Sequence, residues 1–278
     1  MKLKKKEISD YIQKFLNEDK AKQDITSKYF IDNNQTARAL FLSEENMILA
    51  GNNIVLDIFK KHCKNFKLLF KLNDGKKIKK NKKFLAVEGN AIDILSIERT
   101  ALNILQHLSG ISTFTSKFCE KVKSSETIIL DTRKTTPGLR ILEKYATFIG
   151  GAKNHRLNLS RRFMIKDNHL LLNPNIFEKI KKMKKNEKNT LVIECDNLSQ
   201  VKKANSLRIK HILLDNMNFK KIKKAYKIIR KDIKIEVSGG INLQNVKKIS
   251  KIGVNFISVG AITQSAPAAK IKLEIKKI

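Results

Sequence analysis

Side chains that suit anionic ligands follow one apolar run of this sequence after another. The segment DTRKTTPG (131–138) comes directly after the apolar run TIIL and supplies Thr132, Arg133 and Lys134. Two adjacent cations beside hydroxyl groups suit a carboxylate or a phosphate, and arginine binds such groups through a planar fork of donors. A solvated basic turn is the alternative, but the Pro-Gly pair that closes the segment favours a defined turn and hence a binding site.

Two further basic segments have the same character. GGAKNHR (150–156) places His155 and Arg156 after a Gly-Gly turn, and MIKDNH (164–169) places Lys166 at the end of an apolar run. A histidine beside an arginine suits a ligand site, and a purely structural histidine is the alternative. A lysine at a strand end serves either as a Schiff-base nucleophile or as an electrostatic group, and the sequence leaves both open.

Carboxylates and glycine-containing turns end the later apolar runs. Glu194 ends TLVIE and Asp215 ends HILLD, and such a pair facing a phosphorylated substrate suits Mg²⁺ or ribose hydroxyls. Salt bridges to the many lysines are the alternative. The last two runs end in the turns SGG and VGA, whose backbone N–H groups suit a phosphate. The residues of these turns are Ser238, Gly239, Gly240, Gly260 and Ala261.

A repeated pattern of strands and helices positions these residues. Successive apolar runs end at 131, 166, 194, 215, 238 and 260, so their ends are 21 to 35 residues apart. That spacing accommodates a strand, a helix and two loops. Repeated strand–helix units predict parallel strands and favour a TIM-like barrel, whose active site lies at the carboxyl ends of its strands. The candidate residues occupy those ends.

The first ninety residues mix helical and strand patterns and carry little chemistry. EISDYIQKFLNED (7–19) predicts an amphipathic helix. The stretches 37–51 and 66–78 predict strands with turns, including a hairpin at Asp74-Gly75.

A helix is predicted next, over 91–108, and it ends before Gly110. Its apolar residues recur at helical spacing, and Arg99 falls off that apolar face. Arg99 is therefore free to serve a ligand.

Composition limits the possible partners. The 278 residues carry a formal net charge of +32, which invites a nucleic-acid interpretation. The lysines, however, are spread over nearly the whole chain and there is no Trp, so we expect solvated faces and no specific nucleic-acid partner. Six of the nine arginines fall between residues 99 and 162, where the candidate site lies. We find no membrane span, signal peptide or CxxC motif, which predicts a cytoplasmic protein without disulfides.

Taken together, the motifs resemble the quinolinate phosphoribosyltransferase (decarboxylating), or nicotinate-nucleotide pyrophosphorylase, family. The matching stretches are IERTALNILQHLSGIST, ILDTRKTTPGLRILEKYA, GGAKNHR, MIKDNH, IECDNL, LLDNM, VSGGI and ISVGAITQSAPA. The resemblance implies an N-terminal α/β sandwich domain (1–109, with 270–278 packing back on it) and an open TIM-like α/β barrel (110–269). It also implies a homodimer in which the N-terminal domain of one subunit covers the barrel mouth of the other.

The activity implied is decarboxylating transfer of a phosphoribosyl group from phosphoribosyl pyrophosphate to quinolinate, with Mg²⁺, for NAD biosynthesis. Arg99 would reach across the dimer interface, and the SGG and VGA turns would take the 5′-phosphate. The substrate carboxylates would meet Thr132, Arg133, Lys134, His155, Arg156 and Lys166. The implied catalytic residues are Lys134, Lys166, Glu194 and Asp215, of which Glu194 and Asp215 would hold the ribose and Mg²⁺, directly or indirectly.

Three positions depart from the family pattern. Ala152 stands where a third glycine is common, Arg161-Arg162 where an acidic residue is common, and Gln264 where a histidine is frequent. A paralogue with another acceptor, such as the family member associated with molybdate transport, is the nearest alternative. A Schiff-base aldolase built on Lys166 is a second alternative, and a nucleic-acid-binding protein is a third.

Overall fold

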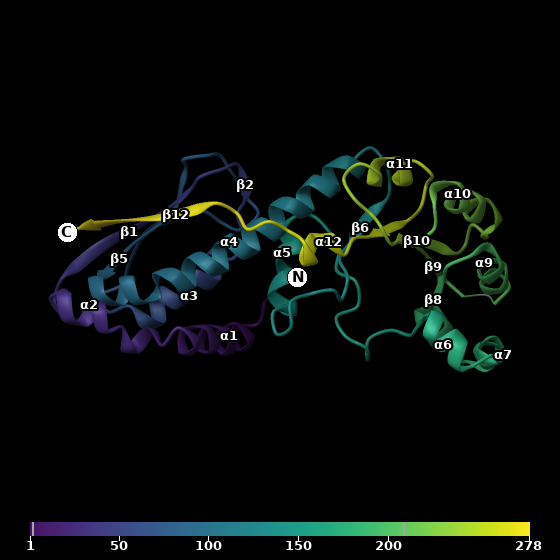
Figure 1. The fold of residues 1–278 in the computed structure, drawn as a ribbon, viewed down its shortest axis with the longest axis horizontal. Helices are drawn as coiled ribbons and strands as arrows, with labels where there is room; N and C mark the ends of the chain where they lie inside the picture. The colour runs from purple at the N-terminus through teal and green to yellow at the C-terminus, as the bar shows by residue number, and fades with distance from the viewer. Residues whose placement is uncertain (2, 208) are drawn as a thin grey trace. The chain divides into compact units, whose positions relative to one another are not determined.

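The computed structural model describes residues 1, 3–207 and 209–278. The chain divides into two compact units. Figure 1 shows the fold, with colour running along the chain from purple at the N-terminus to yellow at the C-terminus. The N-terminal unit comprises Met1–Ser116, Ile141–Gly150 and Ala266–Ile278, and the barrel unit comprises Lys117–Arg140 and Gly151–Ser265. Within the described residues, no helix is both long and apolar enough to cross a membrane. The predicted domain boundary at residue 109 stays a prediction.

An antiparallel sheet forms the N-terminal unit, with strand order β12-β1-β5-β3. Its strands are β1 (Thr36–Ser43), β3 (Lys67–Lys71), β5 (Lys83–Asn90) and β12 (Ile271–Lys277), and β2 (Met47–Ile48) pairs separately with β4 (Lys77–Ile78). The helical elements are α1 (Lys5–Glu18), η1 (Ala21–Gln23), α2 (Ile25–Phe30), α3 (Asn52–His62), the first part of α4 (Ala91–Val122) and, apart from its first residue, α5 (Arg140–Ile149). Phe41, Phe59 and Phe84 are fully buried and join α3 to the sheet.

The predicted hairpin in this unit is wrong. Asp74-Gly75 does not close a hairpin, because β3 pairs with β5 and β4 pairs with β2. The Asp74 carboxylate instead accepts the backbone N–H groups of Gly51 and Asn52 at the start of α3, at 3.1 and 2.9 Å, and so caps that helix. The predicted N-terminal helix is confirmed, since α1 is amphipathic and buries Ile12 and Leu16.

The helix expected to end before Gly110 continues through it to Val122. A Cβ at Gly110 would lie 2.1 Å from the backbone oxygen of Pro267, so the glycine permits a close approach of the chain and does not terminate the helix. The predicted apolar face is buried, and Arg99 is exposed as expected.

The barrel unit contains a six-stranded parallel sheet in the order β6-β11-β10-β9-β8-β7, which confirms the predicted TIM-like α/β type. Its strands are β6 (Ile128–Leu130), β7 (Met164–Ile165), β8 (Val192–Cys195), β9 (His211–Asp215), β10 (Lys234–Ser238) and β11 (Phe256–Ser258). Its helices are the end of α4, α6 (Asp167–Leu172), α7 (Ile176–Lys182), α8 (Lys185–Thr190), α9 (Leu198–Asn205), α10 (Phe219–Ile228), α11 (Val246–Ser250) and α12 (Ala261–Gln264).

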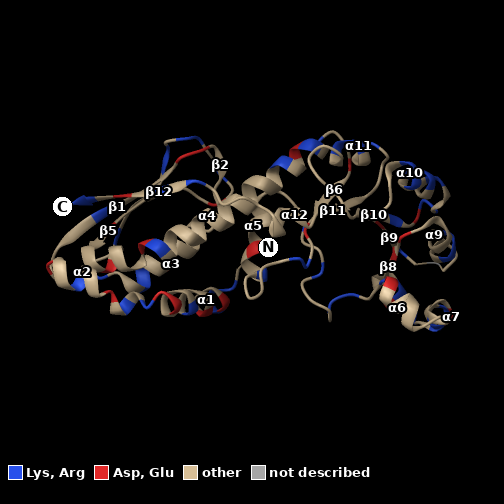
Figure 2. Cartoon of the chain, viewed as in Figure 1, with Lys and Arg blue, Asp and Glu red and all other residues tan. Residues whose placement is uncertain are grey.

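The helix α10 shows how the sequence builds this unit. Asn218 caps it by accepting the Lys221 backbone N–H at 2.9 Å, Ile222 and Ala225 are buried, and the lysines between them are exposed. Figure 2 shows that Lys and Arg are spread in this way over the helices and loops of both units. The charge is therefore a broad solvated coat, as the lysine distribution predicts.

Candidate active site

The carboxyl ends of β9 and β10 bring two predicted site residues into contact. Ser238 is the register partner of Asp215, and its hydroxyl donates a short hydrogen bond to Asp215 Oδ1. Asn216 donates from its side-chain amide to Asp215 Oδ2 at 2.7 Å. Parallel pairing places these residues at one edge of the sheet, so the Asp215 carboxylate is held in a fixed orientation there.

Lys166 and Glu194 form an ion pair at the same edge. Lys166 Nζ donates to Glu194 Oε2 at 2.6 Å, and the Glu194 side chain is only 9% exposed. Burial raises the pKa of Glu194, the hydrogen bond from Lys166 opposes this, and the charge of Asp215 raises the pKa further. The two predicted carboxylates are thus electrostatic neighbours, and the ion pair favours an electrostatic role for Lys166 over a Schiff-base role.

Arg156 lies near two other arginines, Arg133 and Arg162, and near one carboxylate, Glu194. Burial lowers the pKa of Arg156, and repulsion by the charges of Arg133 and Arg162 adds to the effect. Arg133 Nε is buried, and it has no hydrogen-bond partner among the described residues. A buried donor without an acceptor is unfavourable, so this arrangement is suited to receiving an anionic ligand.

Lys134 and Thr132 pack against the turn that follows β11. A Cβ at Gly260 would lie 3.1 Å from Lys134 Cδ and 3.8 Å from Thr132 Oγ1. Thr263, which lies in α12, donates its hydroxyl to the Lys134 backbone oxygen at 2.7 Å. The structure therefore brings together the predicted DTRKTTPG and VGA segments, which are far apart in the sequence.

The SGG turn has the backbone geometry that its glycines allow. Gly239 and Gly240 have φ angles of 83° and 62°, a left-handed conformation that side chains disfavour. A Cβ at Gly239 would also lie 2.1 Å from Asn216 Oδ1. Ala261 begins α12, directly after Gly260. Both glycine turns therefore lie at the carboxyl edge of the sheet, as predicted.

Arg99 belongs to the N-terminal unit, unlike the other predicted site residues. It lies on α4 and lines a shallow pocket of about 350 Å³. The other residues that line this pocket are Asp19, Lys20, Ala21, Gln23, Asp24, Ile25, Leu95 and Ser96. Its side chain is exposed, and no salt bridge is recorded for it among the described residues. Asp19 and Asp24 line the same pocket, but no ion pair joins either of them to Arg99 among the described residues.

The barrel interior contains ionisable residues that the sequence analysis missed. Glu236, on β10, is fully buried, and His211, on β9, is 2% exposed. Glu236 is two residues before Ser238 and shares its face of the strand. A glutamate in an otherwise apolar parallel strand was the available signal, because such strands are normally buried on both faces.

His155 also points into that interior. Its side chain is 8% exposed, and its Nε2 lies 3.4 Å from Glu236 Oε1. The Asp131 carboxylate accepts the His155 backbone N–H at 2.8 Å and the Asn154 side-chain amide at 2.6 Å. His155 is thus near the predicted site, but its ring is engaged by the protein's own residues.

Metal-binding capacity at this edge depends on the two predicted carboxylates. Among the described residues no group of three or more His, Cys, Asp or Glu side chains has metal-site geometry. Glu194 and Asp215 alone suit Mg²⁺, because this ion commonly takes one or two carboxylates and completes its shell with water and substrate phosphates. The donor set therefore fits a Mg²⁺ that arrives with a phosphorylated substrate.

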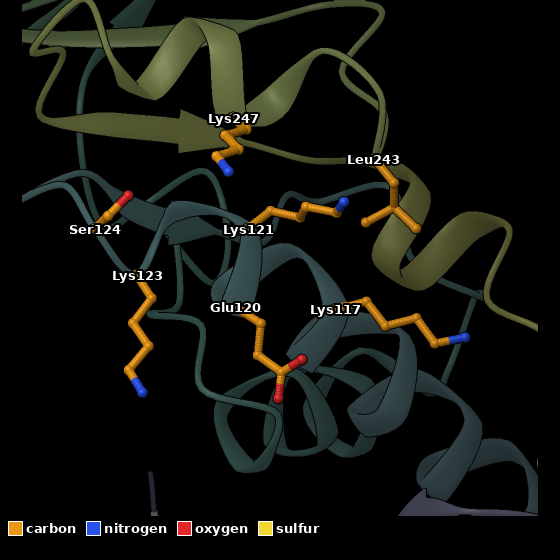
Figure 3. A pocket seen from close by; sticks show the side chains of 7 residues that line it. All are labelled: Lys117, Glu120, Lys121, Lys123, Ser124, Leu243 and Lys247. Carbon is orange, nitrogen blue, oxygen red and sulfur yellow. The ribbon is translucent and has the colours of Figure 1, made fainter.

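A separate pocket of about 720 Å³ lies on the outside of the barrel unit (Figure 3). It is formed by the end of α4 and the segment around the start of α11, and none of the predicted site residues lines it. Its charged residues are Lys117, Glu120, Lys121, Lys123 and Lys247. In a chain this rich in lysine, such a surface is an ordinary part of the basic coat.

Comparisons with known proteins agree with this geometry. The model of the quinolinate phosphoribosyl transferase C-terminal domain matches residues 111–274, and that of the N-terminal domain matches 24–109. A probable nicotinate-nucleotide pyrophosphorylase (carboxylating) of Methanocaldococcus jannaschii is 37% identical over 96% of this chain and 98% of that protein.

Two solved structures are also similar over nearly their whole length. The nicotinate-nucleotide pyrophosphorylase of Ehrlichia chaffeensis has a TM-score of 0.91 and 38% identity, covering 99% of this chain and all of that one. The enzyme of the same name from Francisella tularensis has a TM-score of 0.91 and 34% identity, covering 99% and 98%. The chain belongs to the quinolinate phosphoribosyltransferase family.

Proposed function

We propose that this chain catalyses decarboxylating phosphoribosyl transfer from phosphoribosyl pyrophosphate to quinolinate, giving nicotinate mononucleotide, pyrophosphate and CO₂. The observation that carries the proposal is a cationic cluster at the strand ends, formed by Arg133, Arg156 and Arg162. Within it, the buried Arg133 Nε has no hydrogen-bond partner among the described residues. Repulsion within this cluster is relieved by a ligand that carries more than one negative charge. Quinolinate has two carboxylates, and the phosphoribosyl donor is a polyanion.

The site residues then fall into groups according to the part of the substrates that each group binds. Quinolinate's carboxylates lie against Arg133, Lys134, Arg156 and Lys166, with Thr132 beside them. As pyrophosphate leaves, positive charge develops on the ribose carbon, where Glu194 and Asp215 favour it. The glycine turns bind the 5′-phosphate through Ser238, Gly239, Gly240, Gly260 and Ala261.

No protein nucleophile is needed in this chemistry. The ring nitrogen of quinolinate attacks the ribose carbon, and the bond to pyrophosphate breaks. The resulting pyridinium withdraws the electron pair of the adjacent C–CO₂ bond, so CO₂ leaves and a proton is taken up at that carbon. Mg²⁺, held through Glu194 and Asp215, would neutralise the pyrophosphate charge.

A homodimer completes the proposed site. Arg99 makes no salt bridge within the described residues, and it lies near the start of α2. In α2, Ile25, Tyr29 and Phe30 are 82%, 82% and 75% exposed. Large exposed apolar groups next to each other are typical of an interface. We propose that this surface of one subunit covers the strand ends of the other and presents Arg99 there.

Compartment and other partners follow from composition. Cys63, Cys119 and Cys195 are free thiols, which supports the cytoplasm as the compartment. The basic charge is spread over both units, so we propose small-molecule substrates and no specific nucleic-acid partner.

The test is to incubate the protein with quinolinate, phosphoribosyl pyrophosphate and Mg²⁺ and to measure nicotinate mononucleotide and CO₂. Stoichiometric formation of both products is expected, and chelation of Mg²⁺ should abolish it. Nicotinate should be a poor substitute, because one carboxylate leaves part of the cationic cluster unpaired, which costs on the order of a few kcal/mol. Equal turnover of nicotinate, or turnover of another acceptor only, would contradict the assignment and indicate a paralogous activity.

A further inference from the structure

A buried carboxylate in the barrel interior contacts two histidines, one through each oxygen. Glu236 Oε1 accepts a short hydrogen bond from the Ser258 hydroxyl and lies 3.4 Å from His155 Nε2. Glu236 Oε2 lies 2.9 Å from His211 Nε2. The carboxylate is fully buried, and both histidine side chains are at most 8% exposed, so water does not compete for these contacts.

The opposite nitrogen of each histidine accepts a hydrogen bond. His155 Nδ1 accepts the backbone N–H of Arg156 at 2.7 Å. His211 Nδ1 lies 2.8 Å from a terminal guanidinium nitrogen of Arg162. A backbone N–H and a guanidinium can only donate, so neither Nδ1 carries a proton. Each ring therefore has its proton on Nε2, the nitrogen that lies close to the Glu236 carboxylate.

From this geometry we infer that Glu236 is a positioning residue for the proposed transfer reaction. It holds His155 as the Nε2–H tautomer, and His155 in turn holds the backbone amide of Arg156, so that Arg156 is oriented toward the substrate carboxylates. The inference rests on the proposed function, because the role of Arg156 is part of it. It also gives His155 an indirect role, in place of direct contact with quinolinate.

His211 and Arg162 balance the charge of the buried Glu236 carboxylate. A buried carboxylate requires a cation, and Arg162 provides one through the neutral ring of His211. Arg156 Nη1 also donates to the Arg162 backbone oxygen at 2.9 Å. Arg156 is thus held at its backbone through His155 and at its guanidinium through the Arg162 segment.

Protonation in the interior agrees with this arrangement. Burial lowers the pKa of His211, which favours the neutral ring. Burial alone would raise the pKa of Glu236, but the nearby His155 and His211 rings outweigh it and hold the pKa below its usual range. These directions agree with a neutral His211 ring beside a Glu236 carboxylate.

The decisive variant is Glu236→Gln, which keeps the shape but replaces one acceptor oxygen with an NH₂ donor. That donor faces an Nε2–H, so the histidine on that side must change tautomer or rotate. We expect the KM for quinolinate to rise about tenfold, the scale of losing a residue that orients a ligand-binding group, while kcat and the KM for phosphoribosyl pyrophosphate change less than threefold. A folded Glu236→Gln protein with an unchanged KM for quinolinate would overturn the inference.

A matched control exists in the N-terminal unit. Glu143 is also fully buried, and its Oε1 lies 3.0 Å from His107 Nε2. Glu143→Gln therefore changes a buried carboxylate that pairs with a histidine, here one whose side chain is 38% exposed, without touching the barrel interior. The KM for quinolinate should stay within twofold of the parent, and an increase as large as that of Glu236→Gln would mean that the effect reflects general destabilisation.

Variants of His155 separate positioning from direct binding and cover the case in which Glu236→Gln does not fold. His155→Asn keeps an acceptor where Nδ1 lies, whereas His155→Phe removes it. We expect the KM for quinolinate to stay within threefold for His155→Asn and to rise about tenfold for His155→Phe. Equal loss in both variants would show that the ring itself binds substrate, which contradicts the inference.

Ring-nitrogen NMR of the ligand-free protein tests the tautomer without turnover. In ¹⁵N-histidine-labelled protein, His155 and His211 should both show the Nε2–H pattern, with assignment from single-histidine variants. An Nδ1–H or doubly protonated His155 at neutral pH would refute the tautomer. If the parent protein does not turn over quinolinate, the proposed function fails, and this spectrum still decides whether the Glu236 network exists.

Discussion

The two units of the chain use opposite kinds of sheet. In the N-terminal unit the β12-β1-β5-β3 pairings are all antiparallel, so the carboxyl ends of neighbouring strands point to opposite edges. In the barrel unit the pairings are all parallel, so every carboxyl end lies at one edge. Parallel strands thus gather residues from six separate parts of the chain, which the antiparallel sheet does not do.

This difference explains how chemistry is distributed in the molecule. All predicted site residues except Arg99 belong to the barrel unit, and those that contact one another do so across its strand ends. Of the predicted site residues, the N-terminal unit holds only the exposed Arg99, near the exposed apolar side chains of α2. We therefore expect barrel-unit substitutions to impair the reaction directly and N-terminal substitutions to act through binding or assembly.

The strongest test of this contrast is the loss of Lys134. Lys134→Met should lower kcat by about a thousandfold, the scale of removing one electrostatic group from a preorganised site. Lys121→Met, in the outer pocket of Figure 3, removes the same charge from the same unit and should leave kcat unchanged. The measurement is steady-state formation of nicotinate mononucleotide, and equal losses in both variants would place the chemistry elsewhere.

A smaller effect is expected in the other unit. Arg99→Ala should reduce kcat/KM for quinolinate by about a hundredfold, since a charged hydrogen bond to substrate contributes about 3 kcal/mol, without lowering thermal stability. If the site is shared, mixing Arg99→Ala with Lys134→Ala subunits should restore activity, because each heterodimer contains one intact site. Verified heterodimers that stay inactive would show that Arg99 serves its own subunit or no site.

Acid stability should distinguish the barrel interior from the surface. The pKa of His211 is lowered by folding, so its contribution to stability is present above the unfolded pKa of about 6.5 and is lost as pH falls below it. The pKa of Glu236 is also lowered by folding, so further stability is lost as pH falls below about 4.3, the usual pKa of an unfolded glutamate. Urea unfolding should show that acidification from pH 7.5 to 5.5 destabilises the parent more than His211→Phe, by on the order of 1 kcal/mol. Parallel pH profiles would contradict this.

The smallest effect concerns the lysine coat of both units. Duplex DNA should bind weakly, and its affinity should collapse with salt, because charges on an exposed coat are screened beyond about 8 Å at physiological ionic strength. Affinity for phosphoribosyl pyrophosphate should fall less steeply with salt, since the cationic side chains that would bind it are partly shielded from solvent. The check is a pair of salt titrations, and tight sequence-selective DNA binding at physiological salt would instead indicate a specific nucleic-acid surface.

Much of the barrel unit was predictable from local sequence. The apolar runs ending near Asp131, Glu194, Asp215 and Ser238 form strands, because β-branched and aliphatic residues in short runs between helical segments have few alternatives. Parallel pairing follows from the connections, so the gathering of strand ends was also predictable. The hydrogen bond between Ser238 and Asp215 illustrates this, since both residues were selected from their place at a strand end.

Features that depend on distant chain segments were not predictable. Gly110 looks like a helix terminator until the backbone of Pro267 is seen beside it. Asp74-Gly75 has hairpin chemistry, but Asp74 caps α3 and β3 finds its partner in β5. Likewise, the direction of the His155 ring depends on Glu236, which lies 81 residues further along the chain.

The pairing of β12 with β1 has a consequence for biosynthesis. Ser43 is the register partner of Ile271, so the sheet of the N-terminal unit receives its last strand from the final residues of the chain. On the ribosome, the first unit to emerge must wait with one strand edge of β1 unpaired until the barrel unit has been synthesised. Such long-range closure slows folding. Deleting Ile271–Lys277 would therefore damage a domain whose other strands are translated long before it.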